Sequence, residues 1–167
     1  MSKQNQSELH HVVIVGGNAG GLELATQLGD LLGKSQKARI TLVDQKLTHI
    51  WKPLLHEIAA GTMNTHDEGT NYFAHSAKHH YEFILGRLDK VERDQKQIIL
   101  AKSQASKYEQ TNETLTLSYD TLILAVGSVS NDFNTTGVKE FCHYLDTPTQ
   151  AEIFQQDLLH LYLDAQN

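Results

Sequence analysis

The sequence predicts an α/β fold with a parallel sheet and an antiparallel β insertion. Two continuous apolar runs, 11–15 and 39–43, are typical of strands buried on both faces, and a segment with helical spacing lies between them. Four short strand-like runs separated by charged turns follow further along the chain. A strand, a helix and a second strand in this order favour a right-handed parallel unit, which sets the fold class.

Size and composition suit one soluble domain. The chain has 167 residues, of which 40% are hydrophobic, and a formal net charge of -6. This acidic balance argues against a nucleic-acid partner, which would need clustered basic residues. Cys142 is the single cysteine, so an internal disulfide is excluded and a reducing, cytoplasmic location is expected. No apolar run is long enough to span a bilayer.

The predicted elements follow in order along the chain. Residues 1–10 form a polar tail that we expect to be disordered. Apolar positions at helical spacing predict a helix over 22–32, with Gly33 as its stop. Residues 48–80 have a helical and loop-like pattern. The antiparallel insertion is predicted to comprise strands at 81–85, 88–92, 97–100 and 114–118. A further buried strand is expected at 120–125.

The last helix is predicted to begin at a capping box. Thr147 suits the N-cap, Pro148 the first helical position and Gln150 the capping-box position. The helix has an apolar face made of Ile153, Phe154, Leu158, Leu161 and Tyr162. This face is either part of a core or an exposed interface through which the chain self-associates. Because no strand follows the helix, we expect residues 11–167 to be a partial, truncated domain.

The glycine-rich segment after the first strand is expected to hold the pyrophosphate of a dinucleotide. It comprises Gly16, Gly17, Asn18, Ala19, Gly20 and Gly21. Gly16 would permit the tight turn, and Gly21 would let the helix pack close to the sheet. The N–H groups and dipole at the helix start favour phosphate. Asp44 ends the second strand at the place where an acid hydrogen-bonds ribose hydroxyls.

One position departs from the dinucleotide-binding pattern. The pattern has glycine where this chain has Asn18, because a missing Cβ lets the backbone approach the pyrophosphate. Asparagine tolerates left-handed backbone angles, so we expect the turn itself to persist. Its side chain would still crowd the phosphates. We therefore predict that Asn18 weakens cofactor binding relative to glycine.

Two other patterns in the sequence are weaker. Residues 29–35 resemble a Walker phosphate loop, but three residues separate the glycines where four are needed, and the stretch follows a helix. His75 and His79 stand four apart and would share a helix face. A structural zinc site needs four ligands, and no cysteine lies near this pair, so we expect no metal site.

Three further segments carry a family resemblance. Residues 49–57, with the sequence HIWKPLLHE, are the most distinctive. Residues 119–128 look like the second FAD motif of the two-dinucleotide-binding flavoproteins, with Val126 where threonine is common. Residues 130–134 and 137–140 continue the pattern. Together these segments resemble the N-terminal part of the type II NADH dehydrogenases, so the expected fold is a Rossmann-like FAD-binding domain.

The resemblance implies positions along a bound FAD. The segment from Gly16 to Gly21 would hold the pyrophosphate, and Asp44 the adenosine ribose, with Gln45 beside it. The backbone at Leu88 would meet the adenine edge. The resemblance also implies that Trp51 and Lys52 would lie along the cofactor toward the flavin. Ala125 and Gly127 would pass under the cofactor.

The resemblance also implies a reaction. In this family a hydride moves from NADH to FAD, and two electrons then pass to a quinone. The flavin supplies the chemistry, so no acid–base residue of this chain is assigned as catalytic. Similar full-length enzymes are peripheral proteins of the cytoplasmic membrane face. They continue into an NADH-binding unit, a segment that completes the flavin site and a membrane-docking region.

Two alternatives stand beside this function. We expect none of the family's later segments within these 167 residues, so turnover by this chain alone is not expected. The main alternative is a non-catalytic remnant that binds FAD weakly or not at all. A disulfide reductase would need a redox-active cysteine pair after the second strand, and residues 51–57 contain no cysteine.

Overall fold

The computed structural model describes residues 9–63, 69–101 and 114–166 and divides the chain into two compact units. The first unit comprises Met1–His49 and Asn71–Gly127, and the second comprises Ile50–Thr70 and Ser128–Asn167. Of the tail predicted at 1–10, residues 1–8 lie outside the described residues. His10 belongs to the first strand, so the predicted tail does not extend to residue 10.

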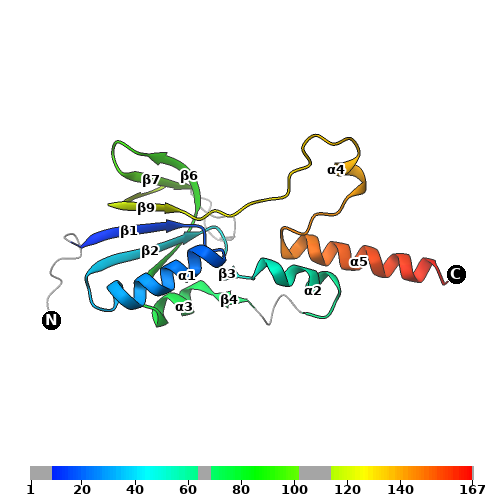
Figure 1. Ribbon diagram of the computed structural model, residues 1–167, viewed down its shortest axis with the longest axis horizontal. Coiled ribbons are helices and arrows are strands. Elements are labelled where there is room, and N and C mark those ends of the chain that lie inside the picture. Colours follow the sequence, from blue (N-terminus) through cyan, green and yellow to red (C-terminus); the bar gives the residue numbers. More distant parts are fainter. Residues whose placement is uncertain (1–8, 64–68, 102–113, 167) are drawn as a thin grey trace. The chain divides into compact units, whose positions relative to one another are not determined.

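The first unit is built on a four-stranded parallel sheet with the order β5–β2–β1–β9 (Figure 1). The strands are β1 (His10–Val15), β2 (Ala38–Asp44), β5 (Glu82–Leu85) and β9 (Thr121–Leu124). Val12 stands opposite Ile40 on one side and Thr121 on the other. The strands predicted at 11–15, 39–43 and 120–125 are therefore confirmed, with shifts of a residue or so at their ends.

The prediction that the strand at 81–85 belongs to the antiparallel insertion is wrong. β5 pairs in parallel with β2, with Thr41 opposite Glu82. Phe83 packs in one core of the unit and Ile84 in the other, so β5 is covered on both faces. A continuous apolar run is the expected pattern for such a strand. The insertion begins only after Gly86, with the strand Arg87–Glu92.

The antiparallel insertion forms a separate three-stranded sheet. Its strands are β6 (Arg87–Glu92), β7 (Gln97–Ala101) and β8 (Leu115–Ser118), in that order and with antiparallel pairing. Alternate residues of β7 are buried: Ile98 is 0% exposed and Leu100 is 1% exposed. This period of two places one face of the insertion against the core.

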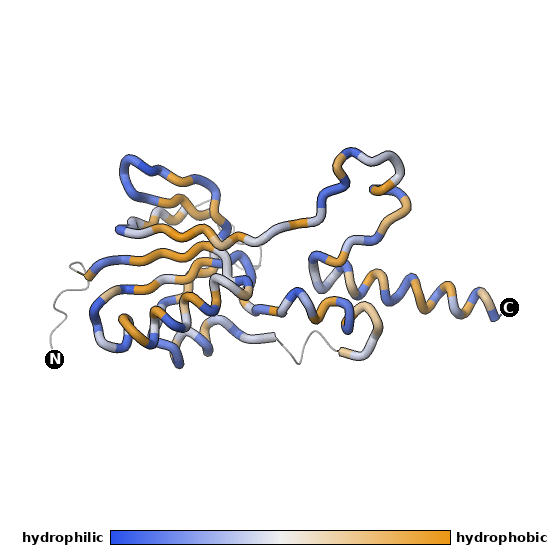
Figure 2. The backbone as a smooth tube through the Cα atoms, in the orientation of Figure 1, coloured by the Kyte–Doolittle hydropathy of each residue, from blue (hydrophilic) through white to orange (hydrophobic). Residues whose placement is uncertain are grey.

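The parallel sheet lies between a helical layer and the antiparallel sheet. Helix α1 (Ala19–Leu28) and helix α3 (Tyr72–Lys78) contribute to the core that contains Val12 and Ile14. Val13 and Val15 face the other way and pack with the insertion. Figure 2 shows the resulting hydrophobic runs along β1 and β2. Both faces of β1 are thus covered, as its sequence predicts.

Two glycines allow the end of the first helix to pack closely. After α1 the chain continues as a π-helical turn, η1 (Gly29–Gly33). A Cβ at Gly29 would lie 2.1 Å from the His79 carbonyl oxygen, and one at Gly33 would lie 2.2 Å from that of His80. The Walker-like stretch is therefore a helix end against a backbone, and the predicted stop at Gly33 is confirmed.

The second unit is helical. It contains η2 (Lys52–Leu54), α2 (Leu55–Ala59), α4 (Val138–Phe141) and α5 (Pro148–Asp164). The short strands β3 (Thr48–His49) and β4 (Thr70–Asn71) pair with each other near the unit boundary. The capping box is confirmed, because the Gln150 N–H donates to Thr147 Oγ1 at 3.2 Å and the Thr147 N–H donates to Gln150 Oε1 at 3.1 Å.

Only the beginning of α5 lies in a core. Ala151 is fully buried and packs with Leu55 and Ile58, with Phe154 beside them. Further along the helix, Leu161 is 66% exposed and Tyr162 is 64% exposed. Self-association through this face stays a prediction. Across the described ranges, no helix combines the length and the hydropathy needed to cross a bilayer.

Candidate functional site

The turn between β1 and α1 requires glycine at Gly16. This residue has φ +104°, in the left-handed region, and its N–H donates to the Val43 carbonyl at 2.8 Å. A Cβ at Gly16 would lie only 2.2 Å from the Ala125 carbonyl oxygen. The tight turn predicted at Gly16 is therefore observed, and it lies against the segment that follows β9.

The backbone of Gly17 is held on both sides. Its N–H donates to Asp44 Oδ2 at 2.6 Å, and its carbonyl oxygen accepts a hydrogen bond from the Tyr72 hydroxyl. A Cβ at Gly17 would meet the Tyr72 hydroxyl oxygen at 2.4 Å. At Gly21, a Cβ would lie 1.9 Å from the Gly16 carbonyl oxygen, so the helix packs as closely as the sequence predicts.

Asn18 does not adopt the left-handed conformation that its residue type tolerates. Its backbone is extended, with φ -66° and ψ -179°, and it is the N-cap of α1. Its Oδ1 accepts the Gly21 N–H at 3.3 Å, and its Nδ2 donates to the Ala125 carbonyl. The glycine of the usual pattern is thus not required here for backbone angles. The replacement of glycine by Asn18 therefore adds a side chain at the helix start without straining the backbone.

Asp44 lies at the end of β2, beside the glycine-rich turn. Besides the Gly17 bond, its Oδ1 accepts the Lys46 N–H at 2.8 Å. A carboxylate has about four acceptor positions, so further donors can still be accommodated. Gln45 follows Asp44 and is exposed. Asp44 is thus a structural residue of the turn as well as a candidate ligand of ribose.

The predicted adenine contact lies in β6. The Gly86 N–H donates to the Asp44 carbonyl at 2.8 Å, which places the start of β6 beside the end of β2. Leu88 stands opposite Leu100 in the antiparallel pair, next to a register shift that ends at Lys90. Leu88 therefore lies two residues from a direct contact with Asp44.

A second glycine-bearing turn follows β9. The Ala125 N–H donates to the Val15 carbonyl at 2.7 Å, so this turn begins beside the end of β1. Gly127 has φ +75° and lies close to Asn18, whose Nδ2 would be 2.9 Å from a Cβ at this position. The structure thus brings Ala125 and Gly127 to the turn of Gly16–Gly21, at the carboxyl ends of adjacent parallel strands.

The start of α1 is suited to an anion. The N–H groups of Ala19 and Gly20 lie in the first helical turn, where no intrahelical acceptor exists. Gly20 is exposed, and a Cβ there would have as its nearest atom Asn18 Oδ1, at 3.8 Å. Open space, free helical donors and close-set glycines fit the pyrophosphate of a dinucleotide.

Two residues beside the turn were not found from the sequence. Tyr72 is 2% exposed, and burial, followed by the Asp44 charge, raises the pKa of its hydroxyl, so the phenol remains a donor to Gly17. Burial lowers the pKa of the half-buried His49, against the opposing influence of the Gly17 backbone and Asp44. Tyr72 belongs to no motif, and His49 opens the 49–57 segment without an expected role, so long-range packing is what reveals their place beside Gly17.

Trp51 and Lys52 lie in the second unit. Trp51 is 52% exposed and precedes η2. Lys52 Nζ donates to the Ser128 carbonyl at 2.6 Å and pairs with Asp146 Oδ1 at 3.0 Å. The Ser130 N–H donates to Asp146 Oδ2 at 2.8 Å, and this bond, together with Lys52, holds the pKa of Asp146 below its usual range. Lys52 therefore joins the 51–57 segment to the chain that follows Gly127.

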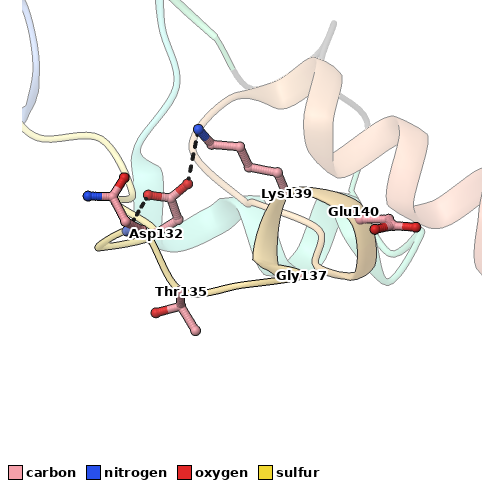
Figure 3. Close-up of a pocket in the computed structure, with 6 residues that line it drawn as sticks. Asp132, Thr135, Gly137, Lys139 and Glu140 are labelled. Atoms are coloured by element: carbon pink, nitrogen blue, oxygen red, sulfur yellow. Dashed lines mark hydrogen bonds and ion pairs between the residues drawn. The ribbon is translucent and has the colours of Figure 1, made fainter.

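A shallow cavity of about 320 Å³ lies elsewhere in the second unit (Figure 3). It is lined by Asp132, Asn134, Thr135, Gly137, Lys139 and Glu140. Lys139 Nζ lies 3.3 Å from Asp132 Oδ2 across it. None of the residues predicted to contact a cofactor lines this cavity.

The histidine pair of α3 is engaged with protein groups. The rings of His75 and His79 stack with centroids 4.4 Å apart. His75 Nδ1 is hydrogen-bonded to the Tyr81 hydroxyl at 3.0 Å, and His79 Nδ1 lies 2.9 Å from Asp30 Oδ2. Within the described part of the chain, no three His, Cys, Asp or Glu side chains are arranged to hold a metal ion.

Two curated proteins with similar sequences are type II NADH:quinone oxidoreductases. The chain is 46% identical over 155 residues to a type II NADH:quinone oxidoreductase of Haemophilus influenzae, covering 93% of this chain and 35% of that protein. It is 27% identical over 140 residues to the Staphylococcus aureus enzyme of the same name, covering 84% of this chain and 32% of that protein. The chain thus spans about a third of the length of these relatives.

Solved structures share the fold, and a family model matches most of the chain. NDH2 of Plasmodium falciparum has a TM-score of 0.76 at 20% identity, over 95% of this chain and 30% of that one. The sulfide:quinone oxidoreductase of Aquifex aeolicus has a TM-score of 0.75 at 24% identity, over 92% of this chain and 32% of that one. The model for pyridine nucleotide-disulphide oxidoreductases matches residues 10–163. The chain therefore belongs to the pyridine nucleotide-disulphide oxidoreductase family.

Proposed function

We propose that this chain is the FAD-binding portion of a flavoprotein that passes electrons from NADH to a quinone. The observation that carries the proposal is the meeting of two glycine-bearing turns, at Gly16 and Gly127, beside Asp44. This is the carboxyl edge of a parallel sheet, where open α/β folds bind nucleotides. The Haemophilus influenzae relative is a type II NADH:quinone oxidoreductase, which supports NADH and quinone as the substrates.

Each part of the turn has a task in this proposal. The N–H groups of Ala19 and Gly20 would hold the pyrophosphate, with the dipole of α1 aligned toward it. Asp44 would accept hydrogen bonds from the ribose hydroxyls while it keeps its bond from the Gly17 N–H. Gly127 would let the cofactor pass without a Cβ clash. When bound, FAD supplies the hydride and electron transfer, and the chain orients it.

A second candidate is a family member that binds FAD weakly or not at all. The observation in its favour is the Asn18 side chain, whose Oδ1 accepts the Gly21 N–H at the helix start. An acceptor at this place competes with a phosphate oxygen for the same donor. The two candidates differ in one measurable quantity, which is the affinity of the chain for FAD.

The absorption spectrum of the purified chain tests the proposal. We expect a bound-flavin spectrum, either as purified or after FAD is added and the excess removed. Because the 167 residues contain one strand–glycine turn–helix unit, NADH is not expected to bleach the flavin of this chain alone. Protein that stays colourless with excess FAD would favour the second candidate. Rapid bleaching by NADH would mean that a site for NADH lies within these residues.

A further inference from the structure

Asn18 joins the two glycine-bearing turns of the first unit. Its carboxamide accepts the Gly21 N–H through Oδ1 and donates to the Ala125 carbonyl through Nδ2. The second bond links residues 107 positions apart in the sequence. One side chain therefore caps α1 and ties the turn after β9 to the turn after β1.

Both glycines of the junction are fitted to this side chain or to its acceptor. A Cβ at Gly127 would lie 2.9 Å from Asn18 Nδ2, and a Cβ at Gly16 would lie 2.2 Å from the Ala125 oxygen that Asn18 binds. Gly127 also has φ +75°, which favours glycine on its own account. The junction is thus closely packed around the Asn18 carboxamide.

The chemistry of this link is specific to a carboxamide. The side chain must both accept from an N–H and donate to a carbonyl oxygen, and Asn carries one group of each kind. Aspartate could accept but would not donate, and its charge would face the Ala125 oxygen. Serine could cap the helix but is too short to span to Ala125 as well. Glycine would supply neither bond.

The same carboxamide occupies part of the helix start. The first turn of α1 offers few N–H groups without an intrahelical acceptor, and Asn18 takes the one at Gly21. A phosphate oxygen at this helix start would compete for that donor. The bond that stabilises the junction is therefore one that a pyrophosphate would have to share or replace.

We propose that Asn18 is a positioning residue with two opposed effects: it stabilises the junction of the two turns and lowers the affinity of the site for FAD. The second effect rests on the proposed function, and the first does not. In this respect Asn18 does the joining that a ligand spanning both turns would otherwise do.

The test compares Asn18→Gly, Asn18→Ser and the wild-type chain, with Asn71→Gly as a matched control. Asn71 is also an N-cap asparagine, whose Oδ1 accepts the Ala74 N–H at 3.1 Å, but no second bond of its side chain joins two turns. Tm is measured on protein stripped of flavin, and the Kd for FAD is measured by titration. Stability and affinity are thus read separately.

For Asn18→Gly we expect Tm to fall by roughly 4 °C and FAD to bind about fivefold more tightly. The Tm of Asn18→Ser should fall less than that of Asn18→Gly, because serine loses the Ala125 bond but retains the cap. Its affinity for FAD should stay close to wild type, because the cap still occupies the Gly21 N–H. The Tm of Asn71→Gly should fall less than that of Asn18→Gly, and its affinity for FAD should be unchanged.

Each other outcome overturns a distinct claim. An Asn18→Gly chain as stable as wild type would overturn the joining role of Asn18. An Asn18→Gly chain that is less stable but binds FAD no better would overturn the competition with phosphate. If no variant binds FAD, the proposed function itself fails, while the Tm comparison still decides whether Asn18 joins the turns.

Discussion

The carboxylate of Asp44 accepts the N–H of Gly17 at 2.6 Å, across 27 positions of sequence. The acid expected to meet a ribose therefore also fixes the turn expected to meet a pyrophosphate. Its second oxygen accepts the Lys46 N–H at 2.8 Å, so one carboxylate binds both the glycine-rich turn and the backbone that follows β2.

Replacing Asp44 with alanine should impair stability and FAD binding together. Two backbone N–H groups lose a charged acceptor, which we expect to cost roughly 2 kcal/mol of unfolding free energy. Asp44→Asn keeps one acceptor oxygen and should lose less. Urea unfolding of both variants measures the difference, with the exposed Asp89→Ala as control. A fully stable Asp44→Ala chain that only loses FAD would restrict Asp44 to a ligand role.

Tyr72 should contribute to the turn through its hydroxyl. Tyr72→Phe leaves the buried ring in place but removes the donor to the Gly17 carbonyl, at an expected cost of about 1 kcal/mol. Tyr81→Phe is the matched control, because its hydroxyl bonds His75 instead of the turn. We expect both variants to lose stability and only Tyr72→Phe to change the Kd for FAD. Equal Kd values for the two variants would count against a site at Gly17.

Alanine at Gly29 or Gly33 should destabilise the first unit strongly. The added Cβ would lie 2.1 Å from the His79 oxygen or 2.2 Å from the His80 oxygen, and both are backbone atoms that cannot rotate away. Overpacking of this kind costs about 1–3 kcal/mol or more. Gly20→Ala is the control for stability, because a Cβ there has open space and alanine favours helix. Thermal unfolding of the three variants gives the comparison.

Lys52 should matter more for stability than another lysine of the same unit. Lys52→Met removes the bond to the Ser128 carbonyl and the pair with Asp146 from a lysine whose side chain is 50% exposed. Lys139→Met removes the pair with Asp132 from a lysine that is 83% exposed, where an ion pair contributes little. We expect the larger fall in Tm for Lys52→Met. The reverse order would mean that the Lys52–Asp146 pair does not hold the segment after Gly127.

The first unit should lose stability when the pH falls below about 6.5. Burial lowers the pKa values of His11, His49 and His75, with the Arg39 charge contributing at His11 and Glu82 and Asp120 opposing it. The unfolded chain therefore binds protons first, so the stability present above the unfolded pKa is lost as the pH falls toward the folded values. Unfolding free energies at pH 7.5 and 5.5 measure this loss. His11→Gln, which can retain a bond to Thr41, should reduce the difference.

Local patterns were sufficient for the elements whose signals are short-range. The capping box at Thr147 and the tight turn at Gly16 depend on residue types within a few positions, and both are observed. The parallel strands β1 and β2 could be predicted because burial on both faces leaves a continuous apolar run.

Partners distant in the sequence could not be predicted. β5 joins the parallel sheet, and its side chains pack in both cores. The apolar run at 83–85 is compatible with burial on both faces, but it does not specify the strand with which β5 pairs. The bonds from Asn18 to Ala125 and from Tyr72 to Gly17 depend on register between elements far apart in the chain. Motif spacing identified the turn and Asp44, but not the bonds that Asn18 and Tyr72 make beside them.

The central position of β1 has a consequence for how the chain folds. One edge of β1 pairs with β2, which follows within thirty residues. The other edge pairs with β9, where Val12 lies opposite Thr121. During synthesis the first edge can form early, whereas the second stays open until more than a hundred further residues have emerged. Pairings of such high contact order form slowly. Nascent chains that end before residue 121 should therefore expose an unpaired β1 edge and depend on chaperones more than longer ones.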